Sequence, residues 1–142
     1  MLKSTDEGST LPLIIFYGVL SLVLVLIVVA ASSLYLERKR LFTLADGAAF
    51  VVAEAFELSA VGPTSVGFRP RLTTSEVRAA VADYVESIPN RFEGLQIERA
   101  ETTDGRSATV SLSSYWRPPV VTLFVPEGIR IEVTSVGRSV FG

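Results

Sequence analysis

The sequence predicts an α+β protein: a single N-terminal transmembrane helix continues into a long juxtamembrane helix, and a short helix and an antiparallel meander of about four strands follow. Three observations support this prediction. Residues 8–36 contain no charged residue. Apolar residues then recur at helical spacing up to Leu58. From Leu95 onward apolar and polar residues alternate, which is the period of a strand.

These patterns divide the chain of 142 residues into four segments. They are an N-terminal head at 1–10, a transmembrane helix at 11–36, a juxtamembrane amphipathic helix at 37–60 and a small α+β domain at 61–142. A domain of that last size has room for one modest core.

The transmembrane segment, 11–36, is rich in Leu, Val and Ile. About 20 apolar residues cross the core of a bilayer, so this run is long enough to span it. Ser9 or Thr10 can cap the helix, and Pro12 suits its first turn. A cleaved signal peptide is the alternative, because the small residues around Ala31 resemble a cleavage site. A signal core has only about 7–15 apolar residues, fewer than this run contains, which argues against a cleaved signal peptide.

A basic triplet, Arg38, Lys39 and Arg40, follows the apolar run. We expect it to mark the membrane interface, where basic side chains meet lipid phosphates. Only Lys3 precedes the run, so the preference of positive charge for the cytoplasm would by itself place the large domain inside.

The juxtamembrane helix carries one apolar stripe, and we expect Gly62-Pro63 to end the helix. Two interpretations of the stripe are open. The helix either lies on its own domain or packs against a partner subunit, which alanines recurring every fourth residue would allow to approach closely. The residues available for subunit packing are Leu41, Leu44, Ala45, Ala48, Ala49, Val52, Ala53 and Phe56.

A short helix is predicted next. Thr73 and Glu76 have the spacing of a helix-capping pair, and Pro89 ends the pattern. After Pro118-Pro119, the segments Val120 to Val125 and Ile129 to Val136 have the composition of two further strands.

A hairpin lies between the short helix and those strands, because Asp104-Gly105 is a strong signal for a two-residue turn. A turn there pairs Ile97 with Leu112, Arg99 with Val110 and Leu95 with Ser114. One face of the hairpin would then be apolar, with Leu95, Ile97, Ala108, Val110 and Leu112. The other would be polar, with Gln96, Glu98, Thr109, Ser111 and Ser113.

The composition does not predict an enzyme. The chain has no Cys and no His, which removes thiol nucleophiles, the usual general base and most transition-metal ligands. We find no phosphate-binding loop or serine-nucleophile motif, and we expect no catalytic residues, cofactor, metal or small-molecule substrate. A net charge of −2 does not favour nucleic-acid binding. We expect Asp46 to lie on a solvated helix face or in a local pair, and Trp116 to close the core.

The order of the N-terminal motifs resembles a known family. Gly8-Ser9-Thr10-Leu11-Pro12 precedes the apolar run, Arg38-Lys39-Arg40-Leu41 follows it, and Ala45-Asp46-Gly47-Ala48-Ala49 comes next. This order is similar to that of the TadE/TadG-like proteins of Flp (Tad) pilus assembly systems, especially the actinobacterial ones. The resemblance covers roughly residues 7–57, and it does not extend to the C-terminal meander.

The resemblance implies a minor pilin-like or assembly subunit in the cytoplasmic membrane, with its C-terminal domain outside. Its expected partners are the lipid bilayer and other single-span pilus subunits. Related prepilins are cut after a glycine, which would place processing between Gly8 and Ser9. Leu13 occupies the position where such prepilins usually have Glu.

Three functions from different classes are therefore open at this point. The first is a structural or assembly subunit of a pilus or secretion machine, acting through helix–helix and domain contacts. The second is a membrane-tethered binding or sensor module, which acts through its sheet. The third is a secreted protein from which the apolar segment has been cleaved.

Overall fold

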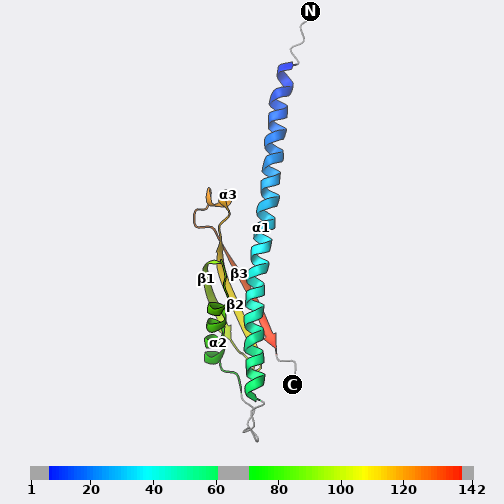
Figure 1. Ribbon diagram of the computed structural model, residues 1–142. Coiled ribbons are helices and arrows are strands. Elements are labelled where there is room, and N and C mark those ends of the chain that lie inside the picture. The colour runs from blue at the N-terminus through cyan, green and yellow to red at the C-terminus, as the bar shows by residue number, and fades with distance from the viewer. Residues whose placement is uncertain (1–6, 61–70, 139–142) are drawn as a thin grey trace, which may run out of the picture. The chain divides into compact units, whose positions relative to one another are not determined.

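The computed structural model describes residues 7–60 and 71–138 (Figure 1). Two compact units make up the chain, residues 1–35 and residues 36–142, and the first helix contributes to both. In chain order the elements are α1 (Glu7–Ala60), α2 (Thr74–Ser87), β1 (Glu93–Glu101), β2 (Ser107–Trp116), α3 (Pro119–Thr122) and β3 (Ile129–Arg138). The fold class is α+β, as predicted.

In the first unit, the described residues all belong to α1. Every side chain from Thr10 to Val29 is exposed, so this part of the helix has no packed face. A helix that is apolar all round is compatible with lipid, where its backbone hydrogen bonds are satisfied internally. Pro12 lies inside the helix, because α1 begins at Glu7, earlier than expected. The predicted stop at Gly62-Pro63 lies outside the described residues.

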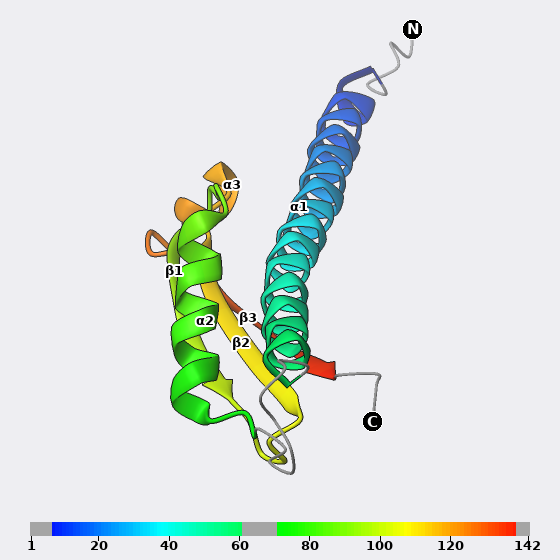
Figure 2. The same ribbon diagram turned by 60° about the horizontal axis from the view of Figure 1, so that its bottom comes forward.

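The second unit has two layers. An antiparallel sheet in the order β1-β2-β3 forms one layer, and the C-terminal half of α1 and the whole of α2 lie on one of its faces (Figure 2). Helix α2 lies beside β1, and α1 lies beside β3, where the Ser135 hydroxyl donates a hydrogen bond to Asp46. The core lies between these layers. Its central residues are Leu41, Ala48, Val77, Val81, Val110 and Leu112, all fully buried.

Over the described residues the sheet has three strands, whereas about four were predicted. Val120 to Val125 was expected to be a strand, but its first residues belong to the short helix α3. Pro118 and Pro119 lack N–H donors, and their fixed backbone angle suits the start of a helical turn. The apolar residues that follow were mistaken for a strand because composition alone does not show whether a segment is buried. Strand β3 was predicted correctly, although Ile129 at its start is exposed.

The hairpin is confirmed, but its register and turn differ from the prediction. Ile97 pairs with Leu112 as expected, whereas Arg99 pairs with Ser111 instead of Val110, because the register shifts between Ile97 and Arg99. The connection is the loop 102–106 and not a two-residue turn. An Asp104 carboxylate oxygen accepts bonds from the Arg106 and Ser107 N–H groups at 2.8 and 2.7 Å, which stabilises this wider loop.

The two faces of β2 are both buried. Ala108, Val110 and Leu112 lie on the helix side, as predicted. Ser111 and Ser113 lie on the opposite side, yet they are 2% and 1% exposed. They are small residues of the central strand, and longer side chains from β1 and β3 cover them.

Candidate functional site

The apolar stripe of α1 lies in the core of the second unit. Its members from Leu41 to Ala53 are at most 7% exposed, and Phe56 is half-buried. They therefore build the core of the chain itself, which agrees with the interpretation that this helix lies on its own domain. They leave little surface for a partner subunit.

Two close approaches fix α1 against the rest of the second unit. A Cβ atom on Gly137 would lie 2.6 Å from the carbonyl carbon of Ala49, so β3 touches the backbone of α1. A Cβ atom on Gly47 would meet the hydroxyl of Tyr84 on α2. Asp46 adds a polar contact, because its Oδ1 accepts a 2.8 Å hydrogen bond from Ser135. Asp46 is exposed on α1, as one of the two expectations had it, and its hydrogen-bond partner lies on β3, 89 residues away, so it is not a local pair.

The outer side of α1 in the second unit carries apolar residues that the sequence analysis did not select. Phe42 and Phe50 are 44% and 58% exposed, and Val51 is also exposed. The predicted stripe is the one with the most regular spacing, and these residues lie outside it. Two large aromatic residues outside the stripe were the feature of the sequence that could have indicated an exposed apolar surface on this helix.

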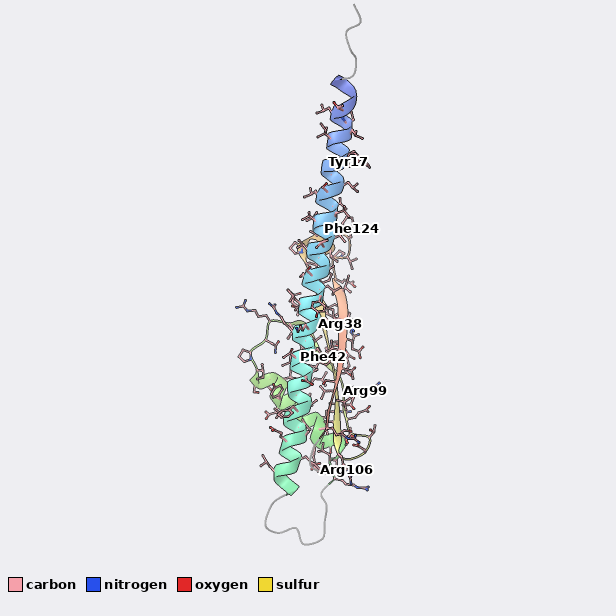
Figure 3. The ribbon with its side chains drawn as sticks, turned by 90° about the vertical axis from the view of Figure 1, so that its right-hand side faces the viewer. Tyr17, Arg38, Phe42, Arg99, Arg106 and Phe124 are labelled. Carbon is pink, nitrogen blue, oxygen red and sulfur yellow. The ribbon has the colours of Figure 1, made fainter. Side chains whose placement is uncertain are left out.

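The basic triplet lies at the N-terminal end of α1 in the second unit (Figure 3). Arg38, Lys39 and Arg40 are exposed. Arg40 lies 3.8 Å from Glu37 one turn earlier, in a weak surface ion pair. The three side chains can therefore reach an anionic partner in the solvent or at a lipid surface.

A cleft of about 530 Å³ lies between α1, α2 and the segment after α2. Arg40, Arg91 and Glu37 give it charges of both signs, and Leu44, Tyr84 and Phe92 give it apolar surface. The cleft was not predicted, because its walls come from segments that are far apart in the chain.

A polar cluster occupies the open face of the sheet. Ser113 donates to Glu98 at 2.5 Å, and Arg130 donates to both Glu98 and Ser113. The hydrogen bond from Ser113 holds the pKa of the Glu98 carboxyl below its ordinary value, with a further contribution from Arg130. A paired, ionised carboxylate of this kind ties the outer strands to the central one.

Trp116 and Arg117 end β2. Trp116 is 6% exposed, which agrees with the expectation that it closes the core. Arg117 pairs with Glu93 at 3.2 Å and lies over the ring of Tyr115, 5.8 Å from its centroid.

The expected processing position lies at the start of α1. Gly8 and Ser9 belong to its first turn, and Leu13 is 53% exposed. Among the described residues, one helix is long and apolar enough to cross a membrane, over Thr10–Phe56. In that same part of the chain, no three Asp, Glu, His or Cys residues are grouped so that they could hold a metal ion.

The comparison with known families agrees with the order of the N-terminal motifs. The Tad family model, described as "Putative Flp pilus-assembly TadE/G-like", matches residues 8–55. No curated protein and no solved structure matches the chain. The matched residues contain the exposed apolar part of α1, the basic triplet and nearly all of the buried stripe. Residues 8–55 are therefore similar to the TadE/G-like segment of Flp pilus-assembly proteins, which agrees with the resemblance that the order of the motifs indicated.

Proposed function

We propose that this chain is a membrane-anchored, non-enzymatic structural or assembly subunit, minor pilin-like, of a Flp-type pilus or a related secretion machine. One observation carries the proposal. The segment that matches the Tad family coincides with a single helix, α1. The first part of this helix is apolar on all sides, and its second part packs against the rest of its own domain. The first part suits a lipid environment.

The two parts of α1 have different roles in this proposal. Residues 11–36 hold the chain in the cytoplasmic membrane as a single pass. The buried stripe from Leu41 to Ala53 holds the domain on the helix, so that the helix cannot leave without exposing the core. Contacts with other single-span subunits use the outer side of the helix, where Phe42 and Phe50 are exposed.

Co-purification tests this assignment. The full chain is expressed with the other single-span subunits of its pilus system and purified in mild detergent. We expect the wild-type chain to retain those subunits and the double variant Phe42→Ser, Phe50→Ser to lose them. Burial of a large aromatic side chain is a main source of affinity at such interfaces.

A matched control separates lost contacts from lost folding. Val136→Ser removes an exposed apolar side chain from β3, away from the outer side of α1, and should leave co-purification unchanged. Fluorescence of the single tryptophan, Trp116, checks that the domain stays folded in each variant. Retention of the partners by the double variant would contradict the role of Phe42 and Phe50. Failure of the wild-type chain to bind any of those subunits would contradict the subunit role itself.

Processing belongs to the same proposal. Cleavage between Gly8 and Ser9 would leave a mature chain that begins immediately before the apolar run. The intact mass of the membrane-extracted protein distinguishes this result from an unprocessed chain. A chain that begins near Ser32 would instead support the secreted alternative.

A further inference from the structure

Among the described residues of the second unit, the connection between β2 and β3 carries the most exposed large apolar side chains. Leu123 and Phe124 are 80% and 83% exposed, whereas no large apolar side chain between Leu11 and Leu36 exceeds 65%. We refer to residues 118–126 as the apolar tip. The tip contains no charged residue, and Thr122 is its one polar side chain.

The tip is well ordered by hydrogen bonds within itself. Val121 and Thr122 donate their N–H groups to Pro118, and Phe124 and Val125 donate theirs to Val121. The Thr122 hydroxyl donates to the Pro119 carbonyl at 2.9 Å. These bonds satisfy four backbone N–H groups and one hydroxyl, which lowers the cost of moving the tip out of water.

The base of the tip is held firmly on the sheet. Arg117 donates to the Glu127 carbonyl at 3.0 Å and pairs with Glu93 on β1. Gly128 has a φ of +79°, and a Cβ atom there would lie 2.6 Å from the Trp116 carbonyl oxygen. The direction of Leu123 and Phe124 is therefore set by the fold of the domain.

That direction is toward the end of the second unit where α1 enters it. Figure 3 shows Phe124 beyond Arg38 in the second unit, whereas Arg106 lies at the opposite end of that unit. Helix α1 enters the unit at Leu36, directly after the apolar run. The apolar tip and the basic triplet therefore share one end of the unit.

We propose that the apolar tip inserts Leu123 and Phe124 into the lipid leaflet from which α1 emerges, while Arg38, Lys39 and Arg40 meet the lipid phosphates. Aromatic and aliphatic side chains beside basic residues are the usual composition of a membrane-surface contact. The domain would then rest on the bilayer by two contacts, which fixes its tilt. This inference rests on the membrane anchoring proposed above.

Fluorescence quenching in vesicles tests it with the full chain. The sequence has no cysteine, so one introduced cysteine carries the only label. Leu123→Cys is labelled with an environment-sensitive dye, and the protein is placed in phosphatidylcholine–phosphatidylglycerol vesicles that contain nitroxide lipids. We expect a blue-shifted emission and loss of intensity with nitroxides placed near the headgroup. The same label on Arg106→Cys should show neither effect.

Two further variants make each outcome decisive. Adding Phe124→Ser to the labelled Leu123→Cys chain should reduce the quenching, which excludes insertion driven by the dye alone. A label on Leu24→Cys reports whether α1 itself lies in the bilayer. Quenching at Leu24 without quenching at Leu123 would overturn the tip proposal and leave the anchor intact. Loss of quenching at both sites would overturn the anchor as well. A blue shift at Leu123 without quenching would assign the tip to a protein surface and contradict the lipid contact.

Discussion

Gly137 shows how closely the sheet approaches α1. The added Cβ of Gly137→Ala would lie 2.6 Å from the Ala49 carbonyl carbon and 3.1 Å from its Cβ, and backbone atoms cannot move aside as a flexible side chain can. Overpacking of this kind costs about 1–3 kcal/mol. We expect Gly137→Ala to lower the free energy of unfolding by that amount, as measured by chemical denaturation in detergent with Trp116 fluorescence. Val136→Ala, at the exposed neighbouring residue, is the control and should have little effect. Equal stability of the two variants would contradict the close contact.

Asp104 makes the stability of the hairpin loop depend on pH. Hydrogen bonds from the N–H groups of Arg106 and Ser107, and from the Ser107 hydroxyl, lower its pKa from 3.8 to about 2. Because the folded-state pKa is lower than the unfolded value, the carboxylate stabilises the fold above about pH 4. This contribution is lost as the pH falls toward about 2.

The predicted consequence is a weaker acid sensitivity in Asp104→Asn. Melting temperatures of the wild-type chain and the variant, measured between about pH 6 and pH 2, should converge at the acid end. Glu127→Gln, a substitution of an exposed carboxylate on another loop, should leave the wild-type profile unchanged. Parallel profiles for wild type and Asp104→Asn would show that the loop bonds do not favour the ionised form.

At the scale of single elements, the patterns that predicted best were local ones. The start of α2 depends on neighbouring residues alone: Thr73 accepts a bond from the Glu76 N–H, and Glu76 accepts one from the Thr73 N–H at 3.0 Å. The long apolar helix and the pairing of Ile97 with Leu112 also follow from local patterns.

The errors arose where residue alternation and composition do not determine the backbone conformation. The register shift between Ile97 and Arg99 accompanies a hairpin loop closed by side-chain bonds, which residue alternation does not reveal. Residues 120–122 are as apolar as a strand, but after two prolines they form a helical turn at the surface. Phe42 and Phe50 were overlooked because their exposure depends on which side of α1 the sheet covers.

The capping box gives a prediction for α2. Thr73→Ala removes the side-chain oxygen that accepts from the Glu76 N–H, and the loss of such a cap costs about 1 kcal/mol. Denaturation followed by Trp116 fluorescence should show this loss. Thr103→Ala, in the exposed hairpin loop, is the matched control, and its free energy of unfolding should be close to that of the wild-type chain. An unchanged midpoint for Thr73→Ala would mean that packing alone, through Val77 and Val81, determines the start of this helix.

For the whole molecule, the decisive question is the side of the membrane on which the domain lies. The basic triplet after the apolar run favours the cytoplasm under the rule of positive charge. That rule weakens for long translocated domains, and the subunit role proposed above places the domain outside. A tip that contacts lipid fits either side, so the orientation must be measured separately.

Cysteine labelling in intact cells measures it, and the structure selects the site. Ser111, on the polar face of the hairpin, is only 2% exposed and would react slowly on either side of the membrane. Thr103 lies in the exposed loop between β1 and β2, so Thr103→Cys is accessible wherever the domain lies. We expect a membrane-impermeant maleimide to label Thr103→Cys in intact cells, because the proposed subunit role requires an extracytoplasmic domain. Ser111→Cys serves as the internal control and should react only after denaturation. Labelling of Thr103→Cys only after lysis would place the domain in the cytoplasm, beside the basic triplet, and would contradict the pilus-subunit orientation.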